Sequence, residues 1–330
     1  MFDITAIGEI LIDFTPGGTN NQSMELFICN PGGAPANVLA MESLLGGKTA
    51  FIGKVGNDYF GSFLKQSIEK SNIDTEGLVI TDKIPTTLAF VHLDASGDRS
   101  FSFYRNPGAD MMLSKEEVKT SLIDNCRIFH FGSVSLTEEP SRSATKFAVD
   151  YARRQKKIIS FDPNYRAPLW IDEQSAKKEI LQVLSNVDIL KVSEEEMQML
   201  TGLSDLKKGA KALSLYGPEL ILISLGRKGA FCYLSGKSGI LPAYDVKTID
   251  TTGAGDAFLG AFLYRVRGKN RDELRNLPQT ELMDILDFAN AAGSLTTMGK
   301  GAVPSMPHLD EIEACRKNVP CCHTKNEGRV

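Results

Sequence analysis

The sequence predicts an α/β protein with a mainly parallel sheet between layers of helices and a small antiparallel β sheet added as a lid. Two observations carry this prediction: short apolar runs alternate with segments of helical periodicity, and two other stretches alternate apolar and polar residues. The chain has 330 residues, 42% of them hydrophobic, which is enough for a sizeable core.

The apolar runs have the length and composition of strands that are buried on both faces. They are "ITAIGEILID" (4–13), "TAFIGKVG" (49–56), "CRIFHFGSV" (126–134), "KIISFD" (157–162), "VDILKVS" (187–193) and "LILISLG" (220–226). Apolar residues at helical spacing occupy 37–46, 61–72, 143–155, 175–186 and 257–266. Strands that alternate with helices in this way form a parallel sheet with right-handed crossovers.

Two stretches break this rhythm. Residues 23–33 and 86–105 alternate with a period of two, and "DASGDR" (94–99) has the composition of a turn between two strands. Each follows the end of an early core strand, so we expect them over the carboxyl edge of the sheet, where open α/β sheets bind ligands.

The last third predicts a helix, a glycine turn and a second helix that begins near Pro307. Four small residues in the first of these helices allow close approach: Ala289, Ala291, Ala292 and Gly293. Their pattern fits either close packing of another helix or contact with a planar ligand.

Charge and targeting signals exclude several classes of protein. The net charge is −4 and there is no long basic run, so nucleic acid is not expected as a partner. Acidic residues interrupt the apolar N-terminus, and no apolar run approaches the length of about 18 residues that a bilayer requires, so neither a signal peptide nor a membrane is expected.

Six cysteines without framework spacing predict reduced thiols and a cytoplasmic location. Cys321, Cys322 and His323 lie together in the tail, but adjacent ligands without a second cluster are a weak metal signal. We expect a flexible tail from about 317 to 330.

"DTTGAGDAF" (250–258) joins an extended segment to a strongly apolar helix. Gly253, Ala254 and Gly255 let backbone N–H groups converge at the helix N-terminus, which forms an anion site, yet Asp256 follows directly. An acid there could simply offset the helix dipole. A hydroxyl that attacks a terminal phosphate would satisfy both features, because the carboxylate takes the proton while the amides bind the charge of the transferred group.

Two other nucleotide motifs are incomplete. "GGKT" (46–49) ends like a P-loop, but Glu42 stands where the first glycine is needed. The segment "GEILID" (8–13) lacks the glycine spacing of a dinucleotide fold, so a dehydrogenase is not expected.

"NPGGAPANVLA" (30–40) is the second candidate site. Gly32 and Gly33 precede a helix that begins near Pro35, and the Asn37 amide in its first turn both donates and accepts, which suits a polyol. Asp13, after the first strand, is either an acceptor for sugar hydroxyls or a strand-end cap.

The motifs "GGAPANVLAMESLLGGKTAFIGKVGNDYFG" (32–61) and "DTTGAGDAFLGAF" (250–262) resemble the two motifs of the ribokinase-like (PfkB) carbohydrate kinases. The similarity covers about residues 3 to 315. Within the family, "GGAPANV", "FYRNPGADM", "DPNYR" and "KVSEEE" are most similar to fructokinases. The resemblance implies a single ribokinase-like domain over 1–330, a three-layer α/β/α core of about nine strands, and a β lid from 14–33 and 86–106 that is shared across a homodimer.

The resemblance also assigns site residues. It implies Asp256 as the base, the amides of Gly253, Ala254 and Gly255 as the anion hole, and Arg166 near the transferred phosphate. For the sugar it implies Asp13, Gly32, Gly33, Asn37, Phe103 and Arg105.

For ATP, the resemblance implies Ser193, Ser224, Gly226, Gly229 and Asn290 besides the glycine turn. It implies a monovalent cation, K⁺, beside Asp250, Thr252, Thr296, Gly299, Gly301 and Ser305, mainly through carbonyls. Mg²⁺ is expected with the ATP phosphates, with indirect help from Glu196. Many relatives have Asn-x-x-Glu where this chain has Ser193 and Glu196, which puts a direct role of position 193 in doubt.

The expected activity is ATP-dependent transfer of the γ-phosphate to the 6-hydroxyl of D-fructose. The alternatives are a kinase for ribose, 2-dehydro-3-deoxygluconate or an aminoimidazole riboside, and, more remotely, a non-catalytic protein on a kinase scaffold. The last would predict damage to the acid or the glycines, and both are intact.

Overall fold

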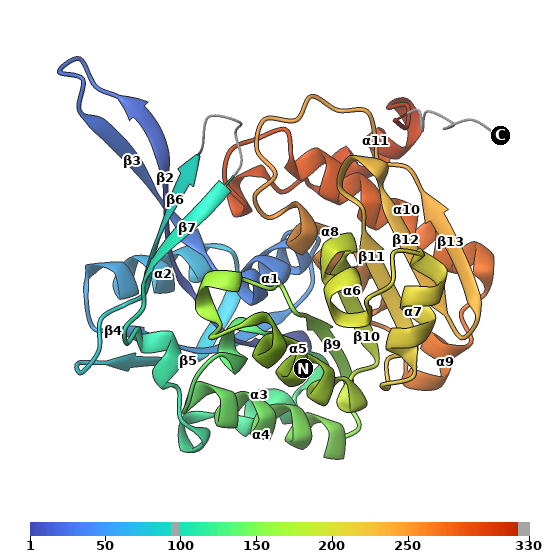
Figure 1. The fold of residues 1–330 in the computed structure, drawn as a ribbon, viewed down its shortest axis with the longest axis horizontal. Helices are drawn as coiled ribbons and strands as arrows, with labels where there is room; N and C mark the ends of the chain where they lie inside the picture. The colour runs from blue at the N-terminus through green and yellow to red at the C-terminus, as the bar shows by residue number, and fades with distance from the viewer. Residues whose placement is uncertain (94–98, 323–330) are drawn as a thin grey trace.

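The computed structural model describes residues 1–93 and 99–322, and within these ranges it contains a sheet of nine strands and a second sheet of four (Figure 1). In the large sheet the spatial order is β13-β12-β11-β10-β9-β8-β1-β4-β5. The strands are β1 (Phe2–Ile7), β4 (Thr49–Gly56), β5 (Ile73–Thr81), β8 (Cys126–Gly132), β9 (Ile158–Asp162), β10 (Ile189–Ser193), β11 (Leu220–Ser224), β12 (Ala230–Leu234) and β13 (Lys237–Leu241). All neighbours from β5 to β11 pair in parallel, while β12 and β13 close one edge antiparallel.

Helices cover both faces of this sheet, and each layer has its own apolar core. One core contains apolar side chains of α1 (Ala34–Leu44), α2 (Tyr59–Lys70), α8 (Ala254–Val266), α9 (Arg271–Arg275), α10 (Gln279–Thr296) and α11 (Leu309–Asn318). The other contains those of α3 (Thr120–Asp124), α4 (Ser141–Arg154), α5 (Glu173–Val183), α6 (Glu194–Thr201) and α7 (Leu206–Ser214). The predicted three-layer α/β/α core is confirmed.

The small sheet is built from two hairpins. Its order is β3-β2-β6-β7, with β2 (Leu11–Thr19), β3 (Glu25–Gly32), β6 (Leu88–Leu93) and β7 (Arg99–Tyr104). Each hairpin is antiparallel, as expected, but β2 and β6 join the hairpins by parallel pairing. The predicted turn "DASGDR" falls mostly on residues 94–98, outside the described residues.

The single strand expected over 4–13 is in fact two strands in different sheets. The chain leaves the large sheet at Gly8, whose N–H donates to Ile52 O at 3.2 Å, and it enters the small sheet at Leu11. Ile10, Leu11 and Ile12 are buried like the residues of β1, so the apolar run continues through the break. Hydrophobicity alone therefore does not reveal the change of sheet.

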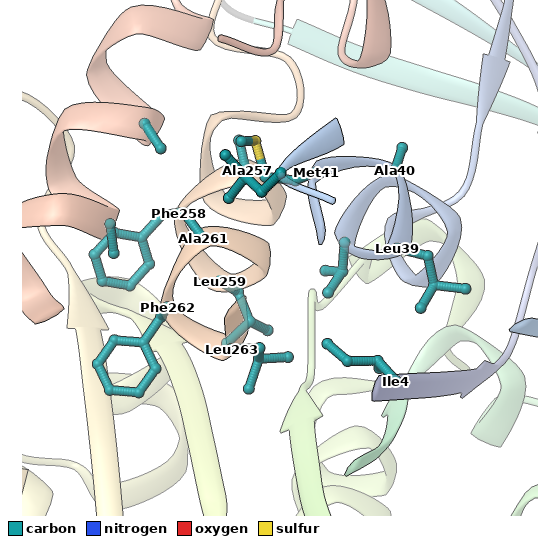
Figure 2. Close-up of a cluster of buried hydrophobic side chains, with 14 of the residues drawn as sticks. Ile4, Leu39, Ala40, Met41, Ala257, Phe258, Leu259, Ala261, Phe262 and Leu263 are labelled. Atoms are coloured by element: carbon teal, nitrogen blue, oxygen red, sulfur yellow. The ribbon is translucent and has the colours of Figure 1, made fainter. Parts of the chain in front are cut away.

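Helices α1 and α8 lie side by side, and their contact positions the site. Figure 2 shows Met41 of α1 beside Ala257 of α8, in the same apolar cluster as Phe258, Leu259 and Phe262. A Cβ on Gly260 would stand 2.7 Å from Val38 O and from Met41 Cβ, so the helix backbones approach closely at this glycine. The first turns of the two helices are thereby held together.

The C-terminal segment pairs with the body of the molecule as far as Cys322. Helix α11 continues to Asn318, and Cys322 N–H donates to Ala243 O at 2.7 Å, while Asp245 N–H donates to Pro320 O at 2.8 Å. The expected tail is thus held by segment 243–245 as far as Cys322, and its remainder, including His323, lies outside the described residues. Among the helices that the structure describes, none has both the length and the apolar character that a bilayer crossing requires.

Candidate active site

The turn before α8 brings backbone donors to a helix N-terminus. Gly253 has φ +76°, and a Cβ there would overlap Ala302. Both the backbone conformation and the lack of space therefore require glycine at this position. The Ala254 N–H donates to Thr251 O at 3.3 Å, whereas the N–H groups of Gly253 and Gly255 have no acceptor within 1–93 and 99–322. Two donors are thus available to an anion, and the third makes a long bond within the turn.

Asp256 lies in the first turn of α8 and is buried, with 7% of its surface exposed. Its carboxylate accepts a hydrogen bond from Asn37 Nδ2 at 2.8 Å and a longer one from Asn164 Nδ2 at 3.4 Å. Burial raises the pKa of this carboxyl, while the Asn37 hydrogen bond and the charges of Lys191 and Arg166 oppose the rise. A carboxylate held in this way has the proton affinity that a general base needs.

Asn37 reaches Asp256 because of the way α1 begins. Gly33 precedes α1 with φ +120°, and a Cβ there would stand 2.5 Å from Glu9 O. Pro35 occupies the first turn, where a missing N–H costs nothing. The glycine pair therefore lets the chain turn sharply off β3 and point the first turn of α1 at α8.

A cavity of about 350 Å³ opens in front of Asp256. Of the sugar residues expected from the sequence, Asp13, Gly33, Asn37, Phe103 and Asp256 line it, as does Arg166. Gly32 borders a smaller neighbouring cavity instead. Burial raises the pKa of Asp13 to about 6, with the Arg166 charge opposing the rise and the Asp256 charge adding to it. Acceptors and donors thus surround a space of the size of a monosaccharide.

Arg105 is not among the lining residues. Its guanidinium is buried and pairs with Asp110 at 2.7 Å, and it also donates to Thr137 Oγ1 at 2.9 Å. The sequence placed Arg105 on the lid strand as a substrate contact, but β7 ends at Tyr104 and the arginine turns into the base of the small sheet. Its several donors are used there to hold protein groups together.

A second cavity, of about 330 Å³, lies on the other side of the glycine turn. It is lined by four residues expected to contact ATP, Ser224, Gly226, Gly229 and Asn290, and by Thr251 and Gly255, which also line the first cavity. The two cavities therefore meet at the turn that carries the free N–H groups.

Small residues of α10 border this second cavity and also pack against α8. Gly293 and Ser294 line it, and a Cβ on Gly293 would stand 3.1 Å from Ala254 O. Asn290 Nδ2 donates to Pro242 O at 2.6 Å, which fixes the helix to the opposite wall. Both interpretations of this helix, close packing and contact with a flat ligand, agree with the structure.

The residues expected around a monovalent cation come from the 250–252 loop, from the last residue of α10, Thr296, and from the loop that follows it. Asp250 accepts from Thr252 N–H at 2.8 Å and from Gly301 N–H at 3.0 Å, so its carboxylate ties the two loops together. Within the described part of the chain, no group of three or more His, Cys, Asp or Glu could hold a metal ion. The hard carbonyl and hydroxyl oxygens that these loops offer fit an alkali cation.

Comparison with known proteins places the chain in a family. The model of the pfkB family carbohydrate kinases matches residues 1–309. The chain belongs to the pfkB family of carbohydrate kinases. The resemblance noted from the two motifs is therefore confirmed.

Curated and solved relatives of this pfkB kinase cover nearly its whole length. It is 41% identical to Fructokinase-1 of Zea mays over 313 residues, which are 94% of this chain and 96% of the relative. A fructokinase with bound ATP from Xylella fastidiosa superposes with a TM-score of 0.88 at 32% identity, covering 96% of this chain and 99% of the other. A fructokinase from Vibrio cholerae O395, in its fructose-, ADP- and calcium-bound form, gives 0.84 at 34% identity, covering 94% and 97%.

Two residues that the sequence assigned to the nucleotide and its metal have other contacts in this pfkB kinase. Ser193 caps α6, because its Oγ accepts from Glu196 N–H at 3.1 Å, and Glu196 returns a bond to Ser193 N–H at 2.7 Å. Glu196 also accepts from Tyr165 N–H at 2.6 Å. Neither residue lines either cavity, so the structure shows both as parts of the framework beneath the site.

The residues of the kinase that line the first cavity without having been expected there include three with charged or amide side chains: Glu9, Asn164 and Lys191. Glu9 accepts from Ala34 N–H at 3.0 Å, and burial raises its pKa to about 7. Asn164 lies in the "DPNYR" segment, two residues before Arg166. Lys191 is a charged residue in the middle of the strand-like run "VDILKVS", a signal that was present in the sequence.

Proposed function

We propose that this pfkB kinase transfers the γ-phosphate of ATP to the 6-hydroxyl of D-fructose. One observation carries the proposal: a buried carboxylate, Asp256, stands beside the glycine turn at which two cavities meet. A sugar in the first cavity and a nucleotide in the second would face each other across this turn. Alignment of two substrates in this way accounts for a large part of the catalysis of phosphoryl transfer.

The proposed reaction needs one base and one anion site. The 6-hydroxyl oxygen forms a bond to the γ-phosphorus as the bond to the bridging oxygen breaks and ADP leaves. Asp256 accepts the hydroxyl proton, and the amides of Gly253 and Gly255 donate to the oxygens of the group in transfer. Arg166 adds a planar, permanently charged donor from the wall of the first cavity.

The sugar is proposed from the relatives and from the pocket together. Fructokinases of Zea mays and Solanum lycopersicum are both 41% identical to this chain, and the Vibrio cholerae structure is a fructose-bound form. Asp13 and Asn37 offer the acceptors and donors that a polyol uses. Ribose, 2-dehydro-3-deoxygluconate and an aminoimidazole riboside are the alternative acceptors. A non-catalytic scaffold is disfavoured because the acid and the glycines are in place.

The proposed reaction involves two metal ions, one bound with ATP and one bound by the protein. Mg²⁺ would arrive with the ATP phosphates, where it supplies charge neutralisation. K⁺ would be held by oxygens of the 250–252 and 296–305 loops, next to the anion site. Both loops are fixed by Asp250, so the bound cation would add positive charge at a preformed position.

We also propose a cytoplasmic homodimer that forms through the small sheet, which would act as a lid. All six cysteines are free thiols, which is typical of reducing compartments. The small sheet exposes several large apolar side chains, Leu26, Phe27, Ile28 and Tyr104, and Met24 is exposed in the turn between β2 and β3. An apolar surface on an extended hairpin is the kind of surface that a second copy covers.

A panel of sugars tests the substrate. With ATP and Mg²⁺, ADP release should be fastest with fructose, and addition of K⁺ should increase it. If ribose or 2-dehydro-3-deoxygluconate matches fructose, the choice of sugar is wrong while kinase activity stands. If no sugar in the panel releases ADP, the catalytic proposal itself fails.

A further inference from the structure

Lys191 is a buried cation at the candidate active site, and the reaction proposed above gives it no role. It lies on β10, where Leu190 and Val192 point into the core beneath α4 to α7. Because side chains alternate along a strand, Lys191 points to the opposite face, toward α1 and α8. Only 8% of its side-chain surface is exposed.

Burial of an ammonium group in this position costs free energy unless its N–H donors form hydrogen bonds. Within residues 1–93 and 99–322, Lys191 donates one hydrogen bond, to Asp162 Oδ2 at 2.8 Å. An ammonium has three donors, and burial of unpaired ones costs several kcal/mol. The remaining donors therefore favour a ligand that brings its own acceptors into the adjoining cavity.

The ammonium group is next to the glycine turn. Its Nζ lies 3.0 Å from the point where a Cβ on Gly255 would stand, so a side chain at that position would crowd it. Lys191 lines the first cavity together with Gly253, Gly255 and Asp256, and Gly255 also lines the second. The charge thus lies where the two cavities meet.

The alternative is that Lys191 has a purely structural role, as a charge that balances the acids around it. Asp162, Glu196 and Asp256 are the acids whose charges act on Lys191, and a cation among them would offset their repulsion. That role requires a nearby charge but no free donors at the turn and no contact with a cavity. A structural role therefore does not explain why the Lys191 ammonium lies against Gly255.

We propose that Lys191 is a further catalytic residue, whose ammonium donates to an oxygen of the phosphoryl group while that group passes between the two cavities. The proposal rests on the proposed kinase reaction at this turn. Lys191 keeps its protons throughout, and it stabilises the charge in transfer alongside the amides of Gly253 and Gly255. Asp162 orients the ammonium through the 2.8 Å ion pair.

Lys191→Met tests this contact. We expect kcat to fall by about 10²- to 10³-fold, as for loss of one transition-state donor, with KM for fructose and ATP changed only a few-fold. Binding gives a second readout. Calorimetric affinity for ADP, fructose and aluminium fluoride together should fall by a similar factor, whereas affinity for ADP alone should stay near that of the wild type.

Two further variants separate contact from charge balance. Lys191→Met with Asp162→Asn removes the whole ion pair, so no buried carboxylate is left without its partner. The double variant should fold and remain as slow as the single one; recovery of kcat toward the wild type would show that Lys191 only neutralises Asp162, and would overturn the proposal.

Lys54→Met is a matched control, because Lys54 is also buried on a strand and pairs with Glu117 at 2.6 Å, yet it lines neither cavity. Its kcat per folded molecule should stay near the wild-type value. A wild type that does not phosphorylate fructose in the same assay would instead overturn the proposed function.

Discussion

At the scale of single residues, burial sets the properties of the important acids. Asp256 and Glu42 are both buried carboxyls whose pKa is raised by desolvation, but their surroundings differ. Asp256 accepts hydrogen bonds from two amides and borders a cavity. Glu42 of α1 is fully buried, and neither of its oxygens has a hydrogen-bond partner in the described residues. The first acid suits proton transfer, whereas the second makes stability depend on pH.

Glu42→Gln should flatten the pH dependence of stability. Burial raises the pKa of Glu42 to about 8, with the Arg267 charge opposing the rise. Between the unfolded and folded pKa values the native state holds the extra proton, so the free energy of unfolding falls as pH rises, by at most about 1.4 kcal/mol per pH unit. The stability gained by the variant should therefore grow from about pH 5 to about pH 8, as measured by urea unfolding.

The exposed Glu138→Gln serves as the control for the loss of one carboxylate, and its effect on the free energy of unfolding should be small. If the free energies of unfolding of the wild type and of Glu42→Gln change with pH in parallel, the assignment of a proton to Glu42 is contradicted.

At the scale of elements, the site depends on two helix starts that glycines make possible. Gly33 lets α1 turn off β3, and Gly253 lets α8 begin directly after the extended segment. The close approach at Gly260 then sets Asn37 against Asp256. These contacts join residues 219 positions apart in the chain.

Gly253→Ala should disrupt the second of these starts. Its φ of +76° is costly for alanine, and the new Cβ would overlap Ala302. We expect a loss of about 1–3 kcal/mol in unfolding free energy and at least about a tenfold fall in kcat, because the amides of the turn move. Denaturant unfolding and steady-state kinetics measure the two effects.

Gly268→Ala is the matched change after the end of the same helix. It has nothing within 4 Å of the new Cβ and no positive φ, so it should leave both quantities near the wild-type values. Equal behaviour of the two alanine variants would contradict the role given to the turn.

The sequence predicted the elements wherever a local pattern specifies them. The apolar runs of β4 and β8 to β11 were recognised because both faces of those strands are buried. The break at Gly8 was missed because burial continues across it, and the parallel joining of β2 to β6 was missed because pairing between distant strands leaves no local pattern.

The same limit applies to the site. The glycine turn and Asp256 form one contiguous motif and could be interpreted directly. Lys191 lies within β10 and Asn164 follows the end of β9, so only the fold brings them to Asp256. Arg105 was assigned to the substrate from its place after a lid strand, but the direction of its side chain depends on Asp110 and Thr137, which follow later in the chain.

At the scale of the whole molecule, the fold places the two cavities at the carboxyl edge of the sheet. The chain runs from β1 to β4 and β5 on one side and then returns to β8 on the other, so β1 marks the point at which the strand order reverses. Open α/β sheets bind ligands at such points. The hairpins that leave β1 and β5 form the small sheet beside the first cavity, and Thr15, Val91 and Phe103 of this sheet line it.

Dimer formation through the small sheet is testable by mass in solution. Leu26 and Ile28 are each 45% exposed and lie on the same face of β3. Light scattering should give twice the chain mass for the wild type and the single mass for the Leu26→Ser, Ile28→Ser variant. Replacement of the exposed Leu215 and Ile171 by serine is the control, and it should leave the dimer intact. A monomeric wild type would contradict the proposed lid contact.

The most direct test of the central claim is phosphoryl transfer by Asp256→Asn. Asparagine keeps the size of the side chain but cannot accept the hydroxyl proton, so formation of fructose 6-phosphate should fall by several orders of magnitude in single-turnover reactions with labelled ATP. Calorimetric ATP affinity and melting temperature should stay close to those of the wild type. A variant that still forms fructose 6-phosphate within about tenfold of the wild-type rate would show that Asp256 is not the base.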